Sequence, residues 1–169
     1  MSNLLTKKAI QEIITLIHKA QEIATQHGWS NIVQPGLIKE MIVADILGHE
    51  VHKTKHQPDA FEYGNPKIGF EYLTCKEGGS FQLDRMFKHP PAKREKSLNR
   101  INRNKMIYCA IFNKDNMLEV LEIWQIDVSK FLAEATRQLE NSSNDISHIG
   151  IPISWAKTNG KLVYPKARP

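Results

Sequence analysis

The stretch that decides the fold reads Ile68-Gly69-Phe70-Glu71-Tyr72-Leu73-Thr74-Cys75, and aromatic and branched side chains dominate it. A shorter run of the same kind, Ala60-Phe61-Glu62-Tyr63, comes before it, and Gly64-Asn65-Pro66 lies between the two. Strand-forming residues on both sides of a glycine–proline turn are typical of a β-hairpin. We therefore predict a hairpin near the middle of the chain and place the other elements around it.

Two helices are predicted before the hairpin. Apolar residues recur at three- and four-residue spacing from 4 to 26, and His27-Gly28 follows as a helix stop. A second helix is expected over 37–47, between Pro35-Gly36 and Gly48. The first helix is longer than a small core requires, so we expect its outer part to serve as a contact in a homodimer.

The second half of the chain contains further strands and one more helix. In chain order we predict strands over 106–112 and 118–126, a helix over 128–139 capped by Asp127, and short strands over 151–155 and 162–164. This order indicates an α/β fold with a central mixed β-sheet flanked by helices. We expect one domain over 1–169, with N-terminal helices in 1–48, a core in 58–126 and a closing part in 127–169.

Composition sets the broad class. The chain has 169 residues, of which 41% are hydrophobic and 24% charged, as in ordinary globular domains. No apolar run approaches the roughly 20 residues that cross a bilayer, so we expect no membrane association. Only two cysteines are present, which favours a reducing cytoplasm over a disulfide framework. The net charge of +5 permits a polyanionic partner, and the alternative is a basic protein without one.

Two acidic residues are expected to meet at the hairpin. Asp59 follows Pro58 at the hairpin's open end, and Glu71 lies on the next strand. Neighbouring carboxylates raise each other's pKa unless a cation joins them, and oxygen ligands of this kind suit magnesium or manganese. We predict a Mg²⁺ site at Asp59 and Glu71, with Glu40 on the preceding helix adding a third carboxylate through water.

Lys76 is the basic residue that follows on the same strand. A lysine near a metal-bound carboxylate pair would orient or deprotonate the attacking water and stabilise charge on the phosphorane. The alternative is that none of the three residues has a role in catalysis. Asp59 would then be a turn residue, Glu71 a solvated strand residue and Lys76 a surface charge.

Pro58-Asp59, the strand that carries Glu71 and the downstream lysine resemble the PD-(D/E)XK nuclease superfamily. The whole layout is similar to the small PvuII-like type II restriction endonucleases, from residues 21–34 through the paired strands after residue 105 to the C-terminal strands. The resemblance implies a restriction-endonuclease-like fold. It also implies a homodimeric, Mg²⁺-dependent enzyme that hydrolyses double-stranded DNA at a specific short site and leaves a 5′-phosphate.

The sequence departs from that family at one position. The family has an acid and a lysine on alternate residues of one strand, but Leu73 stands where the lysine belongs. Because strand side chains alternate faces, Glu71 and Lys76 converge only if a bulge or the strand end re-aims one of them. We predict that Asp59, Glu71 and Lys76 act together in this way, with Gln82 and Lys88 as alternatives for the lysine's role.

A basic stretch follows the proposed catalytic strand. Between residues 85 and 105 there are eight basic residues and a single acid, Glu95. In the resembling family the segment after the catalytic strand runs along the DNA, and glutamine and arginine suit base edges in the major groove. The predicted DNA-contact residues are Gln82, Arg85, Lys88, His89, Lys93, Arg94, Arg100 and Arg103. The alternatives are a glycine turn leading into an ordinary helix and a solvated basic loop.

Three other functions fit the same residues. The first is a structure-specific or repair nuclease on the same scaffold. The chain would instead be a DNA-binding protein without catalysis if the missing lysine reflects a dead site. A third alternative is a protein that shares only the fold of these nucleases and binds RNA through its basic stretch.

Overall fold

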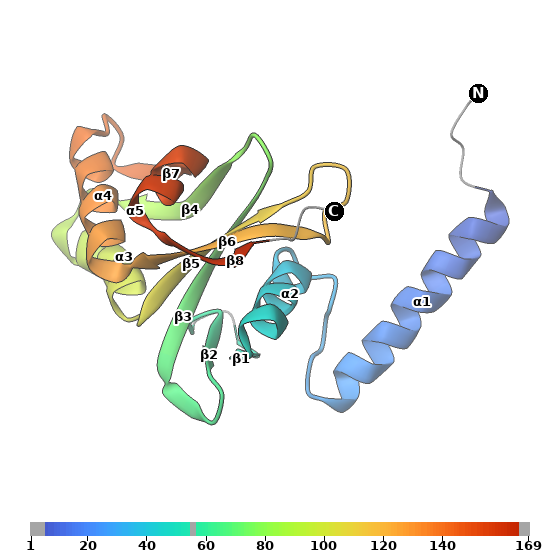
Figure 1. The fold of residues 1–169 in the computed structure, drawn as a ribbon. Coiled ribbons are helices and arrows are strands. Elements are labelled where there is room, and N and C mark those ends of the chain that lie inside the picture. The colour runs from blue at the N-terminus through green and yellow to red at the C-terminus, as the bar shows by residue number, and fades with distance from the viewer. Residues whose placement is uncertain (1–5, 55–56, 166–169) are drawn as a thin grey trace. The chain divides into compact units, whose positions relative to one another are not determined.

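The structure is a computed structural model that describes residues 6–54 and 57–165. The chain divides into two compact units between Ile38 and Lys39, and each unit is described by itself. The division falls inside helix α2 (Leu37–Leu47). Figure 1 shows the elements of both units in chain order.

The first unit contains helix α1 (Lys7–Gln26), which confirms the first predicted helix. Residues 4 and 5 of the expected helix lie outside the described residues. Thr6 caps the helix, because its side chain accepts a hydrogen bond from the Ala9 N–H at 3.2 Å. Gly28 adopts a φ of 85° just after the helix, the conformation that lets a glycine end it.

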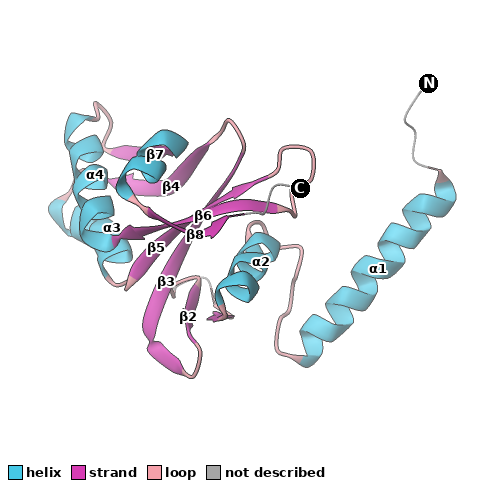
Figure 2. Cartoon of the chain, viewed as in Figure 1, coloured by secondary structure: helices cyan, strands magenta, loops and turns pink. Residues whose placement is uncertain are grey.

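The second unit is built on a six-stranded sheet. Its strands are β1 (His49–Val51), β2 (Ala60–Glu62), β3 (Asn65–Lys76), β5 (Met106–Phe112), β6 (Val120–Asp127) and β8 (Lys161–Pro165). They lie in the order β1-β2-β3-β5-β6-β8; β3 and β5 are parallel and the other pairs antiparallel (Figure 2). The predicted hairpin and the predicted mixed central sheet are therefore confirmed.

Helices and a second sheet flank the central sheet. The remaining elements are β4 (Ser80–Phe87), α3 (Pro91–Asn102), α4 (Val128–Asn141), β7 (Ile146–Pro152) and α5 (Ile153–Asn159), and β4 pairs with β7 in antiparallel fashion. Figure 1 shows α3, α4, α5 and this second sheet on one side of the central sheet, and α2 on the other.

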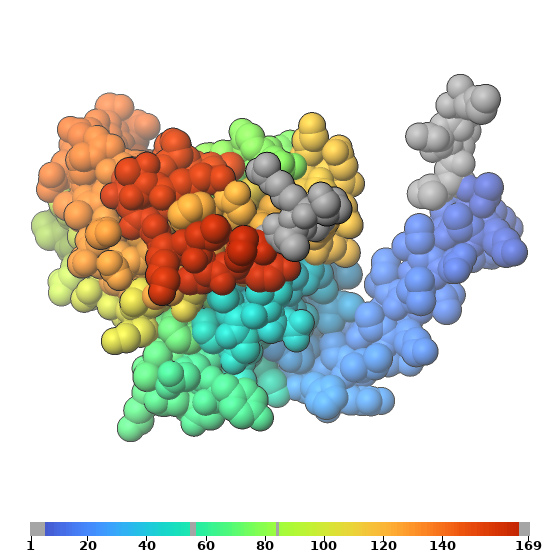
Figure 3. Space-filling view, in the orientation of Figure 1, coloured from blue at the N-terminus to red at the C-terminus, as the bar shows by residue number. Residues whose placement is uncertain are grey.

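The core lies in two hydrophobic clusters, and β3 contributes to both. Leu73 and Cys75 pack in the cluster formed with β4, α3 and α4, whereas Phe70 and Tyr72 pack in the cluster that contains Val43 of α2. β8 joins the second cluster, and Figure 3 shows β8 in red beside α2 in cyan. Odd-numbered residues of β3 thus face α3, and even-numbered residues face α2.

Three local expectations need correction. Residues 153–155 are not strand: β7 ends at Pro152, and α5 begins at Ile153 because Ala156 must reach the core at helical spacing. The segment after Gly78-Gly79 leads into strand β4 rather than a helix. The helix in the basic stretch, α3, was not predicted. Asp127 does occupy the N-cap position of α4, but its side chain makes no capping hydrogen bond.

Within residues 6–54 and 57–165, no helix combines the length and the apolar character that crossing a membrane requires.

Candidate metal centre and nucleic-acid interface

Asp59 lies at the point where β2 and β3 meet. The register pairs Ala60 with Phe70, so one further step places Asp59 opposite Glu71. Opposed residues of antiparallel strands share a face, with Cβ atoms about 5 Å apart. Asp59 is held on both sides: its Oδ2 accepts a hydrogen bond from the Tyr72 N–H at 2.8 Å, and its carbonyl accepts one from the His52 N–H at 2.9 Å. The structure brings Asp59 and Glu71 together.

Gly69 allows this arrangement. A Cβ atom added at Gly69 would lie 2.4 Å from Cγ of Pro58, which is far inside van der Waals contact. Pro58 therefore packs directly on the backbone of β3, and it immediately precedes Asp59. The absence of a side chain at residue 69 fixes the approach of the Pro58-Asp59 segment to the strand that carries Glu71.

Burial dominates the electrostatics of the acid pair. It raises the pKa of Asp59 to about 6, against the hydrogen bond from Tyr72 and the positive charges of Arg103 and Arg100. It also raises the pKa of Glu71 to about 8, and the negative charge of Asp59 adds to this rise. Glu71 Oε2 is buried and finds no hydrogen-bond partner among the described residues. The pair thus favours a bound cation or a shared proton.

The donor set fits a magnesium ion. Asp59 and Glu71 offer carboxylate oxygens, one of which is buried without a partner. Mg²⁺ commonly takes one or two carboxylates and completes its octahedron with water and substrate phosphate. No group of three or more histidine, cysteine or acidic side chains within the described ranges is arranged to hold a metal ion by itself. A two-carboxylate site with open positions is consistent with both observations.

Glu40 adds negative charge to the same region. It lies on α2 one turn before Val43 and Ala44, which are buried in the core. Its charge is among those that raise the pKa of Glu71, so it acts within electrostatic range of the pair. Because α2 packs on the even-numbered face of β3, opposite to Glu71, the role of Glu40 as a third carboxylate through water stays a prediction.

Two arginines at the end of α3 lie near the acids. The positive charges of Arg100 and Arg103 lower the pKa of Asp59 and that of Glu71. The sequence predicted these arginines as DNA contacts and did not place them beside the metal site. They provide the partial charge compensation that two buried carboxylates need.

Lys76 does not reach the acid pair. β3 pairs with β5 in an unbroken register from Phe70 to Lys76, so the bulge that would re-aim the lysine is absent from this segment. Glu71 and Lys76 point to opposite faces of the sheet, and five strand residues separate them by about 16 Å. Lys76 is exposed at the end of the strand. The expected convergence of Lys76 with Glu71 is therefore wrong.

The alternatives for the lysine's role also lie elsewhere. The Lys88 ammonium donates to the carbonyls of Glu140 at 3.0 Å and Ser142 at 2.7 Å, where it caps the end of α4. Gln82 is exposed on β4. Leu73, which holds the family's lysine position, is only 6% exposed and packs in the core.

A cationic stripe runs along α3. Lys93, Lys96, Arg100 and Arg103 are spaced by three, four and three residues, which places them on one face of the helix. The stripe extends over about 15 Å at 1.5 Å per residue. Because Arg100 and Arg103 act on the acid pair, the stripe leads to the candidate metal centre.

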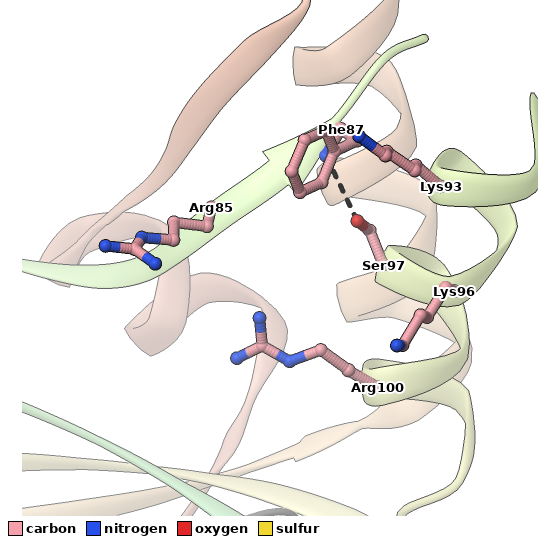
Figure 4. Close-up of a pocket in the computed structure, with 6 residues that line it drawn as sticks. All are labelled: Arg85, Phe87, Lys93, Lys96, Ser97 and Arg100. Carbon is pink, nitrogen blue, oxygen red and sulfur yellow. Dashed lines mark hydrogen bonds between the residues drawn. The ribbon is translucent and has the colours of Figure 1, made fainter. Parts of the chain in front are cut away.

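β4 and α3 enclose a basic hollow of about 470 Å³. Its described lining residues are Arg85, Phe87, Lys93, Lys96, Ser97 and Arg100 (Figure 4). The Phe87 N–H donates to Ser97 Oγ at 3.1 Å and ties the strand to the helix. The Lys93 ammonium lies 5.2 Å from the centre of the Phe87 ring. No acidic side chain is among these described lining residues.

Arg85 reaches this hollow from an irregular point of β4. The β4–β7 register shifts between Leu83 and Met86, and Arg85 adopts a φ of 51°. A left-handed conformation is strained for a residue with a side chain, and such strain concentrates at functional sites. The bulge buries Leu83 and Met86 while Arg85 stays exposed.

Two predicted DNA contacts remain, Arg94 and His89. Arg94 forms an ion pair with Glu140 at 3.0 Å, so its charge is partly compensated within the protein. His89 is exposed in the link between β4 and α3. Sequence reasoning missed Lys96 and Phe87 as site residues. The helical spacing of the cations in 93–103 is the signal that could have found Lys96.

No protein-family model matches the chain, and no curated protein matches it either. The function is therefore argued from the acid pair, the cationic stripe and the basic hollow.

Proposed function

We propose that the protein is a Mg²⁺-dependent endonuclease that hydrolyses DNA. The observation that carries the proposal is the opposed, half-buried pair of Asp59 and Glu71, with both pKa values raised and one buried glutamate oxygen without a partner among the described residues. A pair of this kind is stabilised by a divalent cation. The cationic stripe beside it suits a phosphate backbone.

Asp59 and Glu71 would hold the ion, and Glu40 would add negative charge through water. A bound magnesium ion supplies Lewis acidity toward a phosphoryl oxygen and activates water for attack. The stripe on α3 positions the strand: its length of about 15 Å corresponds to about four nucleotides at 3.4 Å each. These contacts orient the DNA without reading its sequence.

Arg100 and Arg103 take over part of the role that the family gives to its lysine. Their charge reaches the acid pair and would stabilise negative charge that develops on the phosphate. Guanidinium groups stay protonated at any working pH, so neither arginine accepts the proton of the attacking water.

The finer form of the proposal is a homodimeric type II restriction endonuclease. α1 supports a dimer, because Ile10, Ile13, Ile14 and Ile17 follow one helix face and are 44–48% exposed. A twofold dimer would direct two acid pairs to opposite strands of a palindromic site. Cleavage would then occur at a specific short sequence of duplex DNA.

Digestion of plasmid and phage DNA tests the proposal, with the wild-type protein and the variants Asp59→Ala and Glu71→Ala. We expect cleavage that requires Mg²⁺ and falls by at least about a hundredfold in both variants. Discrete fragments would support a site-specific enzyme, whereas cleavage confined to branched or nicked substrates would support a repair nuclease. Lys114→Gln, an exposed change in the β5–β6 turn, is the control and should cleave normally.

A non-catalytic DNA-binding protein is the second candidate. The burial of Leu73 favours it, because no lysine occupies the family's position beside Glu71. In that case duplex DNA stays intact with Mg²⁺ and with Mn²⁺, while binding survives chelation and weakens with salt. Equal or higher affinity for duplex RNA would point to RNA as the natural partner.

A further inference from the structure

We infer that the basic hollow between β4 and α3 is a binding site for a single phosphate group of the DNA strand that is cut. This inference rests on the proposed function for the identity of the strand, but the site itself is defined by its own residues. Four cationic side chains line the hollow: Arg85, Lys93, Lys96 and Arg100. They come from β4 and α3, the two elements that follow the hairpin in the chain.

The hollow has the dimensions of a small-ligand site rather than of a groove for a duplex. Its volume of about 470 Å³ lies within the range of pockets that hold small molecules. One phosphate and part of its sugar can enter a space of this size, whereas a double helix lies across its mouth. Figure 4 shows Arg85 on the strand and Arg100 on the helix, with Lys96 beside Arg100.

The chemistry of the lining selects phosphate. Arginine presents a planar fork of N–H donors that matches phosphate oxygens in pairs, and lysine adds a compact positive charge. A planar carboxylate offers only two oxygens and would compete weakly with a tetrahedral phosphate that two guanidinium forks engage together. The absence of acids among the described lining residues leaves the hollow strongly positive.

The backbone around Arg85 adds an independent observation. Arg85 has a φ of 51°, and the register shift between Leu83 and Met86 displaces it from the ladder that β4 forms with β7. A strained conformation at a residue that lines a cationic hollow indicates that its position serves a ligand. A glycine would adopt the same backbone without strain but could not contact an anion.

Arg100 links the hollow to the candidate metal centre. It lines the hollow, and its charge lowers the pKa of both Asp59 and Glu71. A phosphate in the hollow would therefore contact an arginine whose charge also acts on the acid pair. We assign the hollow to a phosphate next to the one that is hydrolysed, where it fixes the strand against the metal centre.

The test is a titration of the full chain in EDTA, followed by NMR of arginine side chains and backbone amides. The probes are inorganic phosphate and the dinucleotide dTpdT with and without a 5′-phosphate. We expect millimolar binding that shifts the signals of Arg85, Arg100 and Phe87. A stronger effect of the 5′-phosphorylated dinucleotide assigns the hollow to a terminal phosphate, and equal effects assign it to an internal diester.

Two variants locate the binding. Arg85→Gly removes the cation and relieves the strained backbone, and Lys96→Gln removes an exposed cation from α3. Each should weaken phosphate binding about tenfold, the effect of losing one charged hydrogen bond. The double variant Lys114→Gln/Lys161→Gln lowers the net charge by two outside the hollow and should weaken binding less than twofold.

Equal weakening by the control pair and by the hollow variants would overturn the inference, because binding would then follow net charge alone. Shifts confined to other residues would overturn it as well. Asp59→Asn separates this result from the proposed function: it should abolish cleavage and leave phosphate binding intact. A chain that cuts no DNA but binds phosphate in the hollow would contradict the nuclease proposal and not the site.

Discussion

Burial and metal binding favour opposite protonation states of Glu71. Its burial favours the neutral acid, and a divalent cation requires the carboxylate. The pKa of about 8 in the folded protein lies above the ordinary value of 4.5, so the folded state binds more protons than the unfolded state between these pH values. Without metal, the contribution of this group to stability is complete below pH 4.5 and is lost as the pH rises to about 8.

We predict that the free energy of unfolding in EDTA falls as the pH rises from 4.5 to 8. Glu71 contributes at most about 1.4 kcal/mol per pH unit, and the raised pKa of Asp59 adds to the fall below about pH 6. Glu71→Gln should remove most of this fall and be more stable than the wild type at pH 8. Denaturant unfolding at several pH values measures it. Glu95→Gln, an exposed change on α3, is the control and should keep the wild-type slope. A wild-type stability that rises over this range would contradict the buried, protonated glutamate.

Gly69 is predicted to control the metal site without touching a ligand. Gly69→Ala adds a methyl group 2.4 Å from Pro58 Cγ, and the Pro58-Asp59 segment must shift to accommodate it. We expect a loss of about 1–3 kcal/mol in stability, as for other overpacked sites. We also expect at least tenfold weaker Mg²⁺ affinity by isothermal titration calorimetry. Gly150→Ala, where nothing lies within 4 Å of the added atom, should leave Mg²⁺ affinity unchanged.

At the scale of the element, β3 explains why the family's lysine cannot simply be restored. Leu73 points from β3 into the cluster formed with β4, α3 and α4, and it is 6% exposed. Leu73→Lys would bury an ammonium group among apolar side chains. We predict a loss of at least about 3 kcal/mol in the free energy of unfolding and no gain in cleavage. A stable, more active Leu73→Lys protein would show that the strand can present residue 73 to the acid pair.

Periodicity and turn residues were sufficient to predict the elements that alternate clearly between apolar and polar residues. α1 and β6 follow such patterns. β5 is instead a continuous apolar run, and α2 was bounded by Pro35-Gly36 and Gly48. Gly28 and Gly48 end the two helices as predicted. The opposition of Asp59 and Glu71 depends on the register shift between Phe61 and Glu62, because the turn that pairs Glu62 with Asn65 would by itself place Asp59 opposite Ile68. The sequence carries no local signal for that shift.

The rest depended on contacts that are distant in the sequence. α3 is rich in charged residues, and its helical phase shows only in Ser97 and Ile101, which are buried. β4 pairs with β7, more than sixty residues later, so no local signal separates it from a helix. Lys76 was misplaced because the bulge assumed for β3 is absent, which only the pairing with β5 reveals. Lys88 was misplaced because its partners lie at the end of α4, more than fifty residues later.

At the scale of the whole molecule, the exposed face of α1 bears on assembly. Ile13 and Ile17 lie one turn apart at its centre. We predict that Ile13→Asp/Ile17→Asp converts a dimer into a monomer and that DNA cleavage of both strands falls with it. Sedimentation velocity measures the change. Gln11→Asp/Thr15→Asp carries the same charges at the same spacing on a neighbouring face and should stay dimeric. A wild type that is monomeric at all concentrations would contradict the dimer.

The Lys88 ammonium, held by two carbonyls at the end of α4, bears on how DNA binding responds to salt. The ammonium keeps its charge, but two of its three N–H donors are taken by these carbonyls, which holds it on the protein and away from direct contact with a phosphate. The slope of log affinity against log salt concentration therefore reflects the number of cations in the hollow and the stripe that contact phosphate groups. Lys88 is not expected to contribute to this slope. Arg85→Gln should flatten this slope by about one for each protomer, whereas Lys88→Gln should leave it unchanged, as measured by fluorescence anisotropy on duplex DNA.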